Sequence, residues 1–480
     1  MEYEAVIGLE VHAQLKTKTK LFCSCSTEFG AEPNTHGCPV CLGLPGSLPV
    51  LNEEAVNYAI KMALATNCRI NETSIFARKN YFYPDLPKGY QISQYDKPLA
   101  EEGFVEFYVD GEKKRVRLIR IHIEEDAGKL KHEGSDGSLF DVNRAGTPLI
   151  EIVSYPDIRT PKEASEYMKK LRQILLYLGI SDGNMEEGSL RCDANISVRP
   201  KGTDKLGTKT ELKNLNSFRN LEKAIEYEIE RQISLIENGE KVVQETRLWD
   251  PVKNVTRAMR SKEEAHDYRY FPEPDLVPLV VNEEWISNIK ETIEELPNEK
   301  IERFMKDYNL SYYEANLLCE TKERANYYEE VIKIHPDYKQ VANWMLVEVY
   351  RYLNDNNIEI KDFPIKPEDL GELLKFIKDG KITNNIGKKV FQKMIETGKK
   401  AAQIIEEEGL VQISDTSELD AIADEIIKNS PKQVEKYLKG NEKVLGYFIG
   451  QLMRETKGKA NPQIANQLFK KKLEELKNNG

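Results

Sequence analysis

Glu10 and His12 are two residues apart in a segment, residues 6–15, whose side chains alternate between apolar and polar or small types. Such alternation is typical of a β-strand, in which successive side chains point to opposite faces of the sheet. Glu10 and His12 would therefore share one face with Gln14. A carboxylate and an imidazole next to each other on one strand face can bind the same metal ion, so this pair predicts a metal site.

Four cysteines follow this segment in the pattern Cys-x-Cys, twelve residues, Cys-x-x-Cys: Cys23, Cys25, Cys38 and Cys41. Four thiolates can hold Zn²⁺ in a tetrahedron with Zn–S distances of about 2.3 Å. Because cysteine fills every ligand position, no position is left for water, and the pattern predicts a structural zinc knuckle. Four reduced cysteines near a turn are the alternative. The remaining cysteines, Cys68, Cys192 and Cys319, are expected to pack in the core.

A cluster of carboxylates is predicted at the end of another strand, where the chain reads Ile-His-Ile-Glu-Glu-Asp over residues 121–126. Glu151 interrupts the apolar residues 149–153, and a lone charge in such a run is costly to bury without a partner or a metal ion. A charge on an exposed edge strand is the alternative explanation of Glu151. With Glu10 and His12, these carboxylates would form a site rich in oxygen ligands, which favours Mg²⁺ or Mn²⁺ over Zn²⁺.

Two further alternating segments place charges of both signs on one face of a sheet. The polar positions are Arg191, Asp193, Asn195 and Ser197 in the first segment and Lys209, Glu211 and Lys213 in the second. A half-solvated sheet shows the same alternation, but cations beside carboxylates also suit a metal–phosphate site. The sequence has no G-x-x-x-x-G-K-[ST] phosphate loop and no G-x-S-x-G motif. A nucleotide would therefore have to bind on an open sheet face, as in glutamine-synthetase-like sites.

The elements that must position these residues predict an α+β fold. Strands are expected over residues 116–123, 149–153, 190–198 and 208–212, and helices over residues 161–179 and 217–239. After residue 283 the composition is that of helices, with breaks at prolines and glycines. We therefore predict a mixed-sheet domain, a glutamine-synthetase-like cradle with the zinc knuckle, over residues 1–290. Two all-helical domains would follow, over residues 291–408 and 409–480.

Charge is unevenly distributed along the chain. The formal net charge of −11 argues against indiscriminate binding to nucleic acid. From Lys428 to the end, however, twelve Lys and Arg residues stand against five Asp and Glu. This excess is typical of a module that faces nucleic acid, although a solvated helical face has the same composition. No apolar run approaches the roughly 18–20 residues of a membrane span, and the first residues lack a signal-peptide pattern. We expect a cytoplasmic protein with no membrane partner.

Several long motifs together carry a family resemblance over essentially the whole chain. They are residues 7–12 (Ile-Gly-Leu-Glu-Val-His), the four-cysteine set, and residues 77–90, 122–129, 141–146, 191–195, 267–276 and 457–462. With these motifs the chain resembles the B subunits of tRNA-dependent aspartyl/glutamyl-tRNA amidotransferases.

The resemblance implies that the chain uses ATP to phosphorylate the side-chain carboxylate of Glu-tRNA(Gln), Asp-tRNA(Asn) or both, after which ammonia displaces the phosphate and leaves an amide. It implies Mg²⁺ held by His12, Glu125 and Glu151, with Glu124 as the alternative to Glu125. The implied catalytic residues are Glu10, Glu125, Asp193 and Arg191, with Glu10 and Asp193 near a second ion. The implied nucleotide contacts are Arg191, Lys209, Glu211 and Lys213.

The resemblance also implies partners. A separate amidase (A) subunit would release ammonia from glutamine, a small (C) subunit would join it, and mischarged tRNA would bind the helical and tail domains by its shape. The mouth of an ammonia tunnel is expected near Lys79, Tyr81, Tyr83 and Lys88, although an ordinary loop with surface aromatics fits these residues equally well.

Two other classes of function fit parts of the sequence. A tRNA-binding scaffold without chemistry has no use for buried carboxylates beside a histidine. A metal-dependent ligase acting on a free amino acid has no need of a basic tail.

Overall fold

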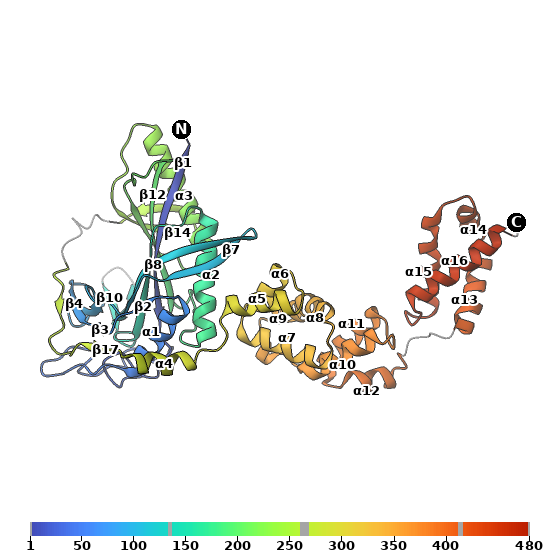
Figure 1. Ribbon diagram of the computed structural model, residues 1–480, viewed down its shortest axis with the longest axis horizontal. Coiled ribbons are helices and arrows are strands. Elements are labelled where there is room, and N and C mark those ends of the chain that lie inside the picture. The colour runs from blue at the N-terminus through green and yellow to red at the C-terminus, as the bar shows by residue number, and fades with distance from the viewer. Residues whose placement is uncertain (1, 133–136, 260–267, 411–415, 479–480) are drawn as a thin grey trace. The chain divides into compact units, whose positions relative to one another are not determined.

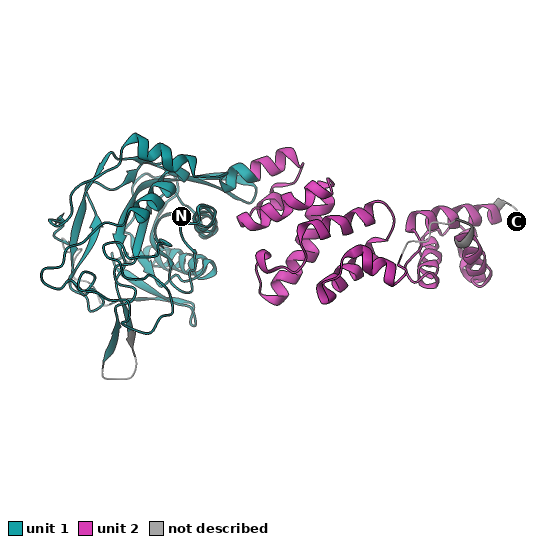
Figure 2. Cartoon of the chain, turned by 90° about the horizontal axis from the view of Figure 1, so that it is seen from below, with its two compact units in different colours: residues 1–300 teal, residues 301–480 magenta. Residues whose placement is uncertain are grey.

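The computed structural model describes residues 2–132, 137–259, 268–410 and 416–478 (Figure 1). Asp267, the first residue of the motif over residues 267–276, lies outside this part of the chain. The chain divides into two compact units, residues 1–300 and residues 301–480, which Figure 2 draws in different colours. The described part of unit 1 contains a mixed sheet and that of unit 2 contains helices without strands, which confirms the α+β fold class.

Unit 1 is built on one large sheet that has ten strands in the described residues. Its order is β15–β14–β13–β12–β1–β11–β8–β6–β2, and β7 pairs with the first part of β8. The strands are β1 (Tyr3–Gln14), β2 (Arg69–Ile70), β6 (Ala100–Glu101), β7 (Phe104–Val109), β8 (Glu112–Glu125), β11 (Pro148–Ser154), β12 (Leu190–Pro200), β13 (Thr210–Lys213), β14 (Thr246–Asp250) and β15 (Val255–Ala258). Only β13 and β14 pair in parallel among these described strands. The sheet is therefore mixed, with β1 in its middle.

One face of this sheet carries the core of unit 1. On β1 the side chains of Leu9 and Val11, which alternate with Glu10 and His12, have no exposed surface. They belong to one apolar cluster with residues of α1 (Glu53–Ala65), α2 (Pro161–Leu178) and α3 (Phe218–Glu237), which Figure 1 shows beside the sheet. Burying this face leaves the polar side chains of β1 on the other one.

Local signals in the sequence account for the ends of the two long helices. The Thr160 hydroxyl caps α2 by accepting a hydrogen bond from the Glu163 backbone N–H, and Gly179 ends the helix in the left-handed conformation (φ 67°). The Ser217 hydroxyl caps α3 in the same way. The predicted helices over residues 161–179 and 217–239 are thus confirmed to within two residues.

Smaller elements complete unit 1. They are a three-stranded sheet of β16 (Phe271–Pro272), β4 (Phe76–Asn80) and β5 (Tyr90–Gln94), the pairs β9 (Lys129–His132) with β10 (Ser138–Asp141) and β3 (Thr73–Ser74) with β17 (Leu279–Val280), and α4 (Glu283–Glu291). Arg78 on β4 donates to both carboxylate oxygens of Glu273, at 2.7 and 2.9 Å, and so fixes residues 271–275 against β4.

Unit 2 consists of helices grouped around two separate apolar cores in the described residues. The first core runs from Ile301 to Ile405 and the second from Leu419 to Leu473. The helices are α5 (Pro297–Asp307), α6 (Tyr312–Leu318), α7 (Lys322–Ile334), α8 (Tyr338–Trp344), α9 (Tyr350–Asn356), α10 (Pro367–Lys378), α11 (Asn384–Thr397), α12 (Ala401–Glu407), α13 (Thr416–Lys428), α14 (Pro431–Leu438), α15 (Leu445–Glu455) and α16 (Pro462–Asn478), with short 3₁₀ or π turns over Met345–Val349, Ile360–Asp362 and Glu442–Val444. The three-domain division at residues 290 and 408 stays a prediction. No described helix has the length and apolar character that crossing a membrane requires.

Candidate active site

The pairing of four strands places two histidines, a glutamate and an arginine in one row. His122 on β8 lies opposite Glu151 on β11, and Glu151 lies opposite His12 on β1. His12 in turn lies opposite Arg191 on β12. Because directly paired residues point to the same face and neighbouring strands are about 4.8 Å apart, these four side chains stand side by side. The row lies on the polar face of the sheet.

Two residues of this row, His12 and Glu151, can hold one metal ion together with Glu124. One ligand atom from each of His12, Glu124 and Glu151 lies within 4.8 Å of the other two. His12 Nε2 is 3.5 Å from Glu151 Oε2 and 3.8 Å from Glu124 Oε1. His122 Nε2 lies 3.0 Å from Glu151 Oε2 and 3.4 Å from Glu124 Oε2, so a second imidazole borders the group. Two carboxylates with one imidazole are a donor set for Mg²⁺ or Mn²⁺.

The charges in this group depend on one another. Burial disfavours the protonated imidazole of His12, but Glu151 and Glu124 outweigh burial and raise its pKa. The same balance raises the pKa of His122 to about 9. Burial also disfavours ionised Glu124 and Glu151, yet the neighbouring histidines hold the pKa of both carboxyls below its usual value. Positive charge beside these two carboxyls, whether on an imidazole or on a bound cation, therefore favours their ionised form.

Glu125, the predicted metal ligand, is not part of this group. Successive residues of β8 point to opposite faces, so Glu125 faces away from His122 and Glu124. Its Oε1 atom accepts hydrogen bonds from Lys88 Nζ at 2.5 Å and from the Ile92 backbone N–H at 2.9 Å. The structure therefore favours Glu124, the alternative ligand, and gives Glu125 a buried cation as its partner.

A second group of carboxylates lies beside the first. Glu10 is opposite Asp193 across the β1–β12 pair, and Asn195 is opposite Glu211 across the β12–β13 pair. The Asn195 amide donates to Glu10 Oε1 at 2.9 Å. Burial and the nearby charges of Glu151, Glu211 and Asp193 raise the pKa of Glu10. A second cation at this position would relieve that repulsion, and the second ion near Glu10 and Asp193 stays a prediction.

Of the residues predicted to contact phosphate, Arg191 and Lys213 already form ion pairs with carboxylates, and Lys209 is exposed. Arg191 Nη2 is 2.9 Å from Asp126 Oδ1, and Gln14 donates to the other oxygen of Asp126 at 2.7 Å. Lys213 Nζ is 2.6 Å from Asp193 and 3.3 Å from Glu211. Lys209 is exposed in the loop before β13. The structure thus gathers Arg191, Glu211 and Lys213 on the polar face, whereas Lys209 is exposed before β13 and its charge still acts on Glu211.

His122 and Asp126 were not assigned as site residues from the sequence, and Glu124 was named only as the alternative to Glu125, although all three stood in the predicted acidic segment. The alternation of the sequence around these residues could have identified them. Ile121 and Ile123 are fully buried in the core, so strict alternation places the residues between and after them on the other face.

The expected tunnel residues lie on β4 and in the loop between β4 and β5. The Lys79 ammonium is 4.8 Å from the centre of the Tyr268 ring, and the Tyr81 ring lies 6.0 Å from the same ring. Lys88 forms the buried pair with Glu125 described above. Tyr83 is 51% exposed, so it lies at the surface of the loop that follows β4.

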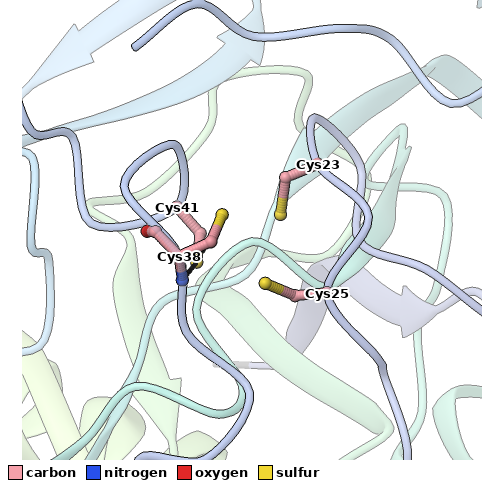
Figure 3. A group of neighbouring side chains, drawn as sticks. All are labelled: Cys23, Cys25, Cys38 and Cys41. Carbon is pink, nitrogen blue, oxygen red and sulfur yellow. Dashed lines mark hydrogen bonds between the residues drawn. The ribbon is translucent and has the colours of Figure 1, made fainter. Parts of the chain in front are cut away.

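The four cysteines of the predicted knuckle converge. Their sulfur atoms lie within 4.8 Å of one another, and Figure 3 shows Cys23 and Cys25 from one loop facing Cys38 and Cys41 from another. Four sulfurs around a tetrahedral Zn²⁺ would be about 3.8 Å apart, so the set fits this ion. A hydrogen bond from Cys23 and the nearby charge of Lys20 lower the pKa of Cys41 to about 4, which favours the thiolate that a metal requires.

Comparison with known proteins covers almost the entire chain. Residues 5–287 match the GatB/GatE catalytic domain family, and residues 326–473 match the GatB domain family. A protein of Thermodesulfovibrio yellowstonii, named as the B subunit of aspartyl/glutamyl-tRNA(Asn/Gln) amidotransferase, is 59% identical over 475 residues, which is 99% of this chain and 100% of that protein. Proteins of the same name from Carboxydothermus hydrogenoformans and Geotalea daltonii are each 57% identical over 99% of this chain and their own full length.

The chain belongs to the family of aspartyl/glutamyl-tRNA(Asn/Gln) amidotransferase B subunits. This confirms the predicted family, and with it the role of the B subunit in a tRNA-dependent amidotransferase, an enzyme of the ligase class. The catalytic-domain match contains every residue of the two carboxylate groups and of the cysteine set.

Proposed function

We propose that this subunit phosphorylates the side-chain carboxylate of Glu-tRNA(Gln), Asp-tRNA(Asn) or both with ATP, and then replaces the phosphate by ammonia from a partner glutaminase subunit. The observation that carries the proposal is the convergence of His12, Glu124 and Glu151 on one sheet face beside the carboxylates of Glu10 and Asp193. A tRNA-binding scaffold would not require such a group of charges.

The chemistry explains why this face needs metal ions. A carboxylate is a poor acyl donor because its leaving group would be oxide, and phosphorylation converts that oxygen into a good leaving group. Phosphorylation brings two anions together, and their repulsion must be offset by positive charge. When bound at His12, Glu124 and Glu151, Mg²⁺ would supply that charge and polarise the phosphoryl oxygens.

The chain's own residues hold this arrangement in place. The Nε2 atom of His122 lies within 3.0 Å of Glu151 and 3.4 Å of Glu124 and so helps to fix both carboxylates, a role typical of residues that support metal ligands. Asp126 holds Arg191 over the same face, and Asp193 holds Lys213. We propose that Glu10 and Asp193 bind a second divalent ion, and that Arg191 and Lys213 stabilise negative charge as it moves from the nucleotide to the substrate.

The cysteine set has a separate role in this proposal. Cys23, Cys25, Cys38 and Cys41 would hold a structural Zn²⁺, because four thiolates leave no open position for substrate. The knuckle is linked to the carboxylates of β8 through Lys88. A Cβ atom at Gly43 would lie 2.4 Å from Lys88 Cγ, so the knuckle packs directly against the lysine that pairs with Glu125.

The remaining parts of the reaction require partners. We propose that an amidase (A) subunit, joined by a small (C) subunit, supplies ammonia near Lys79, Tyr81 and Lys88, and that mischarged tRNA is bound by the helical part of the chain. The basic excess after Lys428 fits contacts to phosphates. A cytoplasmic location would agree with this role in protein synthesis.

Substituting Glu151 by Gln tests the proposal. The assay follows transfer of the labelled γ-phosphate of ATP to Glu-tRNA, using the assembled amidotransferase with excess Mg²⁺. We expect Glu151→Gln to abolish phosphorylation while the affinity for Glu-tRNA stays within about twofold. Glu112→Gln, an exposed change on β8, is the matched control and should behave as the unchanged enzyme. Full phosphorylation by the Glu151 variant would remove the proposed metal role.

A further inference from the structure

Most cations on the polar face of the sheet already have a carboxylate partner. Arg191 is paired with Asp126 and Lys213 with Asp193, each at a distance below 3 Å. A phosphate that bound to these cations would have to compete with the carboxylates that hold them. The first contact of an anionic ligand is therefore expected at a cation that has no such partner.

Arg120 is a cation of this kind. It lies on β8 two residues before His122, and its Nε atom is buried without a hydrogen-bond partner in the described residues. Among the residues that the structure describes, no carboxylate forms an ion pair with the guanidinium group of Arg120. Glu101, its neighbour across the β6–β8 pair, is instead bound by Arg69 and Asn71. A buried arginine donor without an acceptor is costly, and an anionic ligand would satisfy it.

An irregularity in the sheet directs Arg120 toward the site. Leu118 pairs with Ser154, but Arg120 pairs with Val153, so β8 has one extra residue at Ile119. Leu118 and Ile121 are both fully buried in the core, although only two residues lie between them and strict alternation would place them on opposite faces. The bulge therefore shifts the alternation, and Arg120 lies on the same face as His122 and Glu124. Bulges that redirect a side chain in this way are frequent next to active sites.

A second cation and an aromatic pair lie next to Arg120. The Lys79 ammonium is 4.8 Å from the centre of the Tyr268 ring, and the Tyr268 and Tyr270 rings lie 6.1 Å apart. The charges of Lys79 and Arg120 both act on the Tyr270 hydroxyl. Tyr270 stacks on Tyr95 with ring centres 4.2 Å apart and planes 5° apart. Lys79 also lies near Glu124, one of the metal-binding candidates. Positive charge and an aromatic surface thus border the carboxylate group on its β8 side.

We propose that Arg120 binds the phosphates of ATP on the β8 side of the metal-binding group, with Lys79 as the second cation of this subsite. The planar guanidinium group of an arginine can form two parallel hydrogen bonds to a phosphate group. Two residues along a strand span about 7 Å, so Arg120 is the next side chain on the same face of β8 before His122, whose partner is Glu151. This inference rests on the proposed function, because it assigns a residue to the nucleotide site of that reaction.

The test is the equilibrium dissociation constant of ATP with excess Mg²⁺ for the full-length chain in its assembled enzyme. We expect Arg120→Gln to weaken binding about 10- to 100-fold, the effect of losing a charged hydrogen-bonded pair. Arg120→Lys keeps the charge but loses the two-pronged contact, so its loss should be smaller. Arg115→Gln, an exposed change on the same strand that affects the surface pair with Glu106 and the contact with the Phe104 ring, is the matched control and should bind as the unchanged protein does.

Three results would overturn the inference. Equal dissociation constants for the Arg120→Gln variant and the unchanged protein would overturn it and leave the proposed function standing. A higher KM for Glu-tRNA with unchanged ATP affinity would assign Arg120 to the substrate carboxylate instead. If the unchanged protein bound no ATP, both the inference and the proposed function would fail. Should Arg120→Gln not fold, the Arg120→Lys variant alone decides, because an affinity equal to that of the unchanged protein would also refute the inference.

Discussion

Replacing Glu125 by Gln should destabilise unit 1 without removing the metal site. The side chains of Lys88 and Glu125 are only 8% and 4% exposed, and they form an ion pair of 2.5 Å. Removing one partner of a buried pair leaves an uncompensated charge, which costs about 3–5 kcal/mol. For a unit of 300 residues, each kcal/mol lowers Tm by about 2 °C, so we expect a decrease of about 6–10 °C.

The assay combines thermal unfolding, followed by circular dichroism, with titration of Mn²⁺. We expect the Glu125→Gln variant to unfold at a lower temperature yet to bind Mn²⁺ with the affinity of the unchanged protein at 20 °C. The double variant Lys88→Met with Glu125→Met removes both charges and should recover much of the lost stability. An unchanged Tm together with lost Mn²⁺ binding would refute this reasoning and restore Glu125 as the metal ligand.

Three further predictions concern the zinc knuckle, the buried histidines and the tail. Elemental analysis should find about one zinc per chain, and Cys38→Ser should lower that content, whereas Cys319→Ser should leave it unchanged. In metal-free protein the pKa of His122 is raised to about 9, so the stability that protonated His122 contributes is complete below its unfolded pKa near 6.5 and is lost as pH rises through about 9. Urea unfolding between pH 6 and 10 should show this loss of stability, and the His122→Asn variant should not show it. Phe448→Ala should destabilise the core over residues 419–473 by about 3–5 kcal/mol, because this ring is fully buried there, whereas the exposed Tyr313→Ala should not measurably change stability.

Much of the fold could be predicted because the signals were local. The strand over residues 149–153 is found over Pro148–Ser154, and the helix opened by Thr160 ends at Gly179 as its capping residues require. Alternation in residues 190–198 correctly placed Cys192, Ala194 and Ile196 in the core. These features depend on residues close to one another in the chain, so periodicity and caps are enough to locate them.

The parts of the site that the sequence could not supply depend on distant contacts. Nothing near Glu125 reveals that Lys88 is its partner, and Arg78 and Glu273 are 195 residues apart. The bulge at Ile119 breaks the alternation of β8. Alternation counted from the first residues of β8 therefore places the side chains after the bulge on the wrong face of the sheet. The choice of Glu124 over Glu125, by contrast, was within reach, since Ile121 and Ile123 mark the core face beside them.

The most direct test of the account is the position of a bound Mn²⁺ ion, located by anomalous scattering from crystals grown with MnCl₂ at pH 7. The account predicts an ion between His12 Nε2 and the carboxylates of Glu124 and Glu151, and no such ion in the Glu151→Gln variant. An ion bound by Glu125, or no ion on this sheet face in crystals saturated with Mn²⁺, would contradict the proposed mechanism.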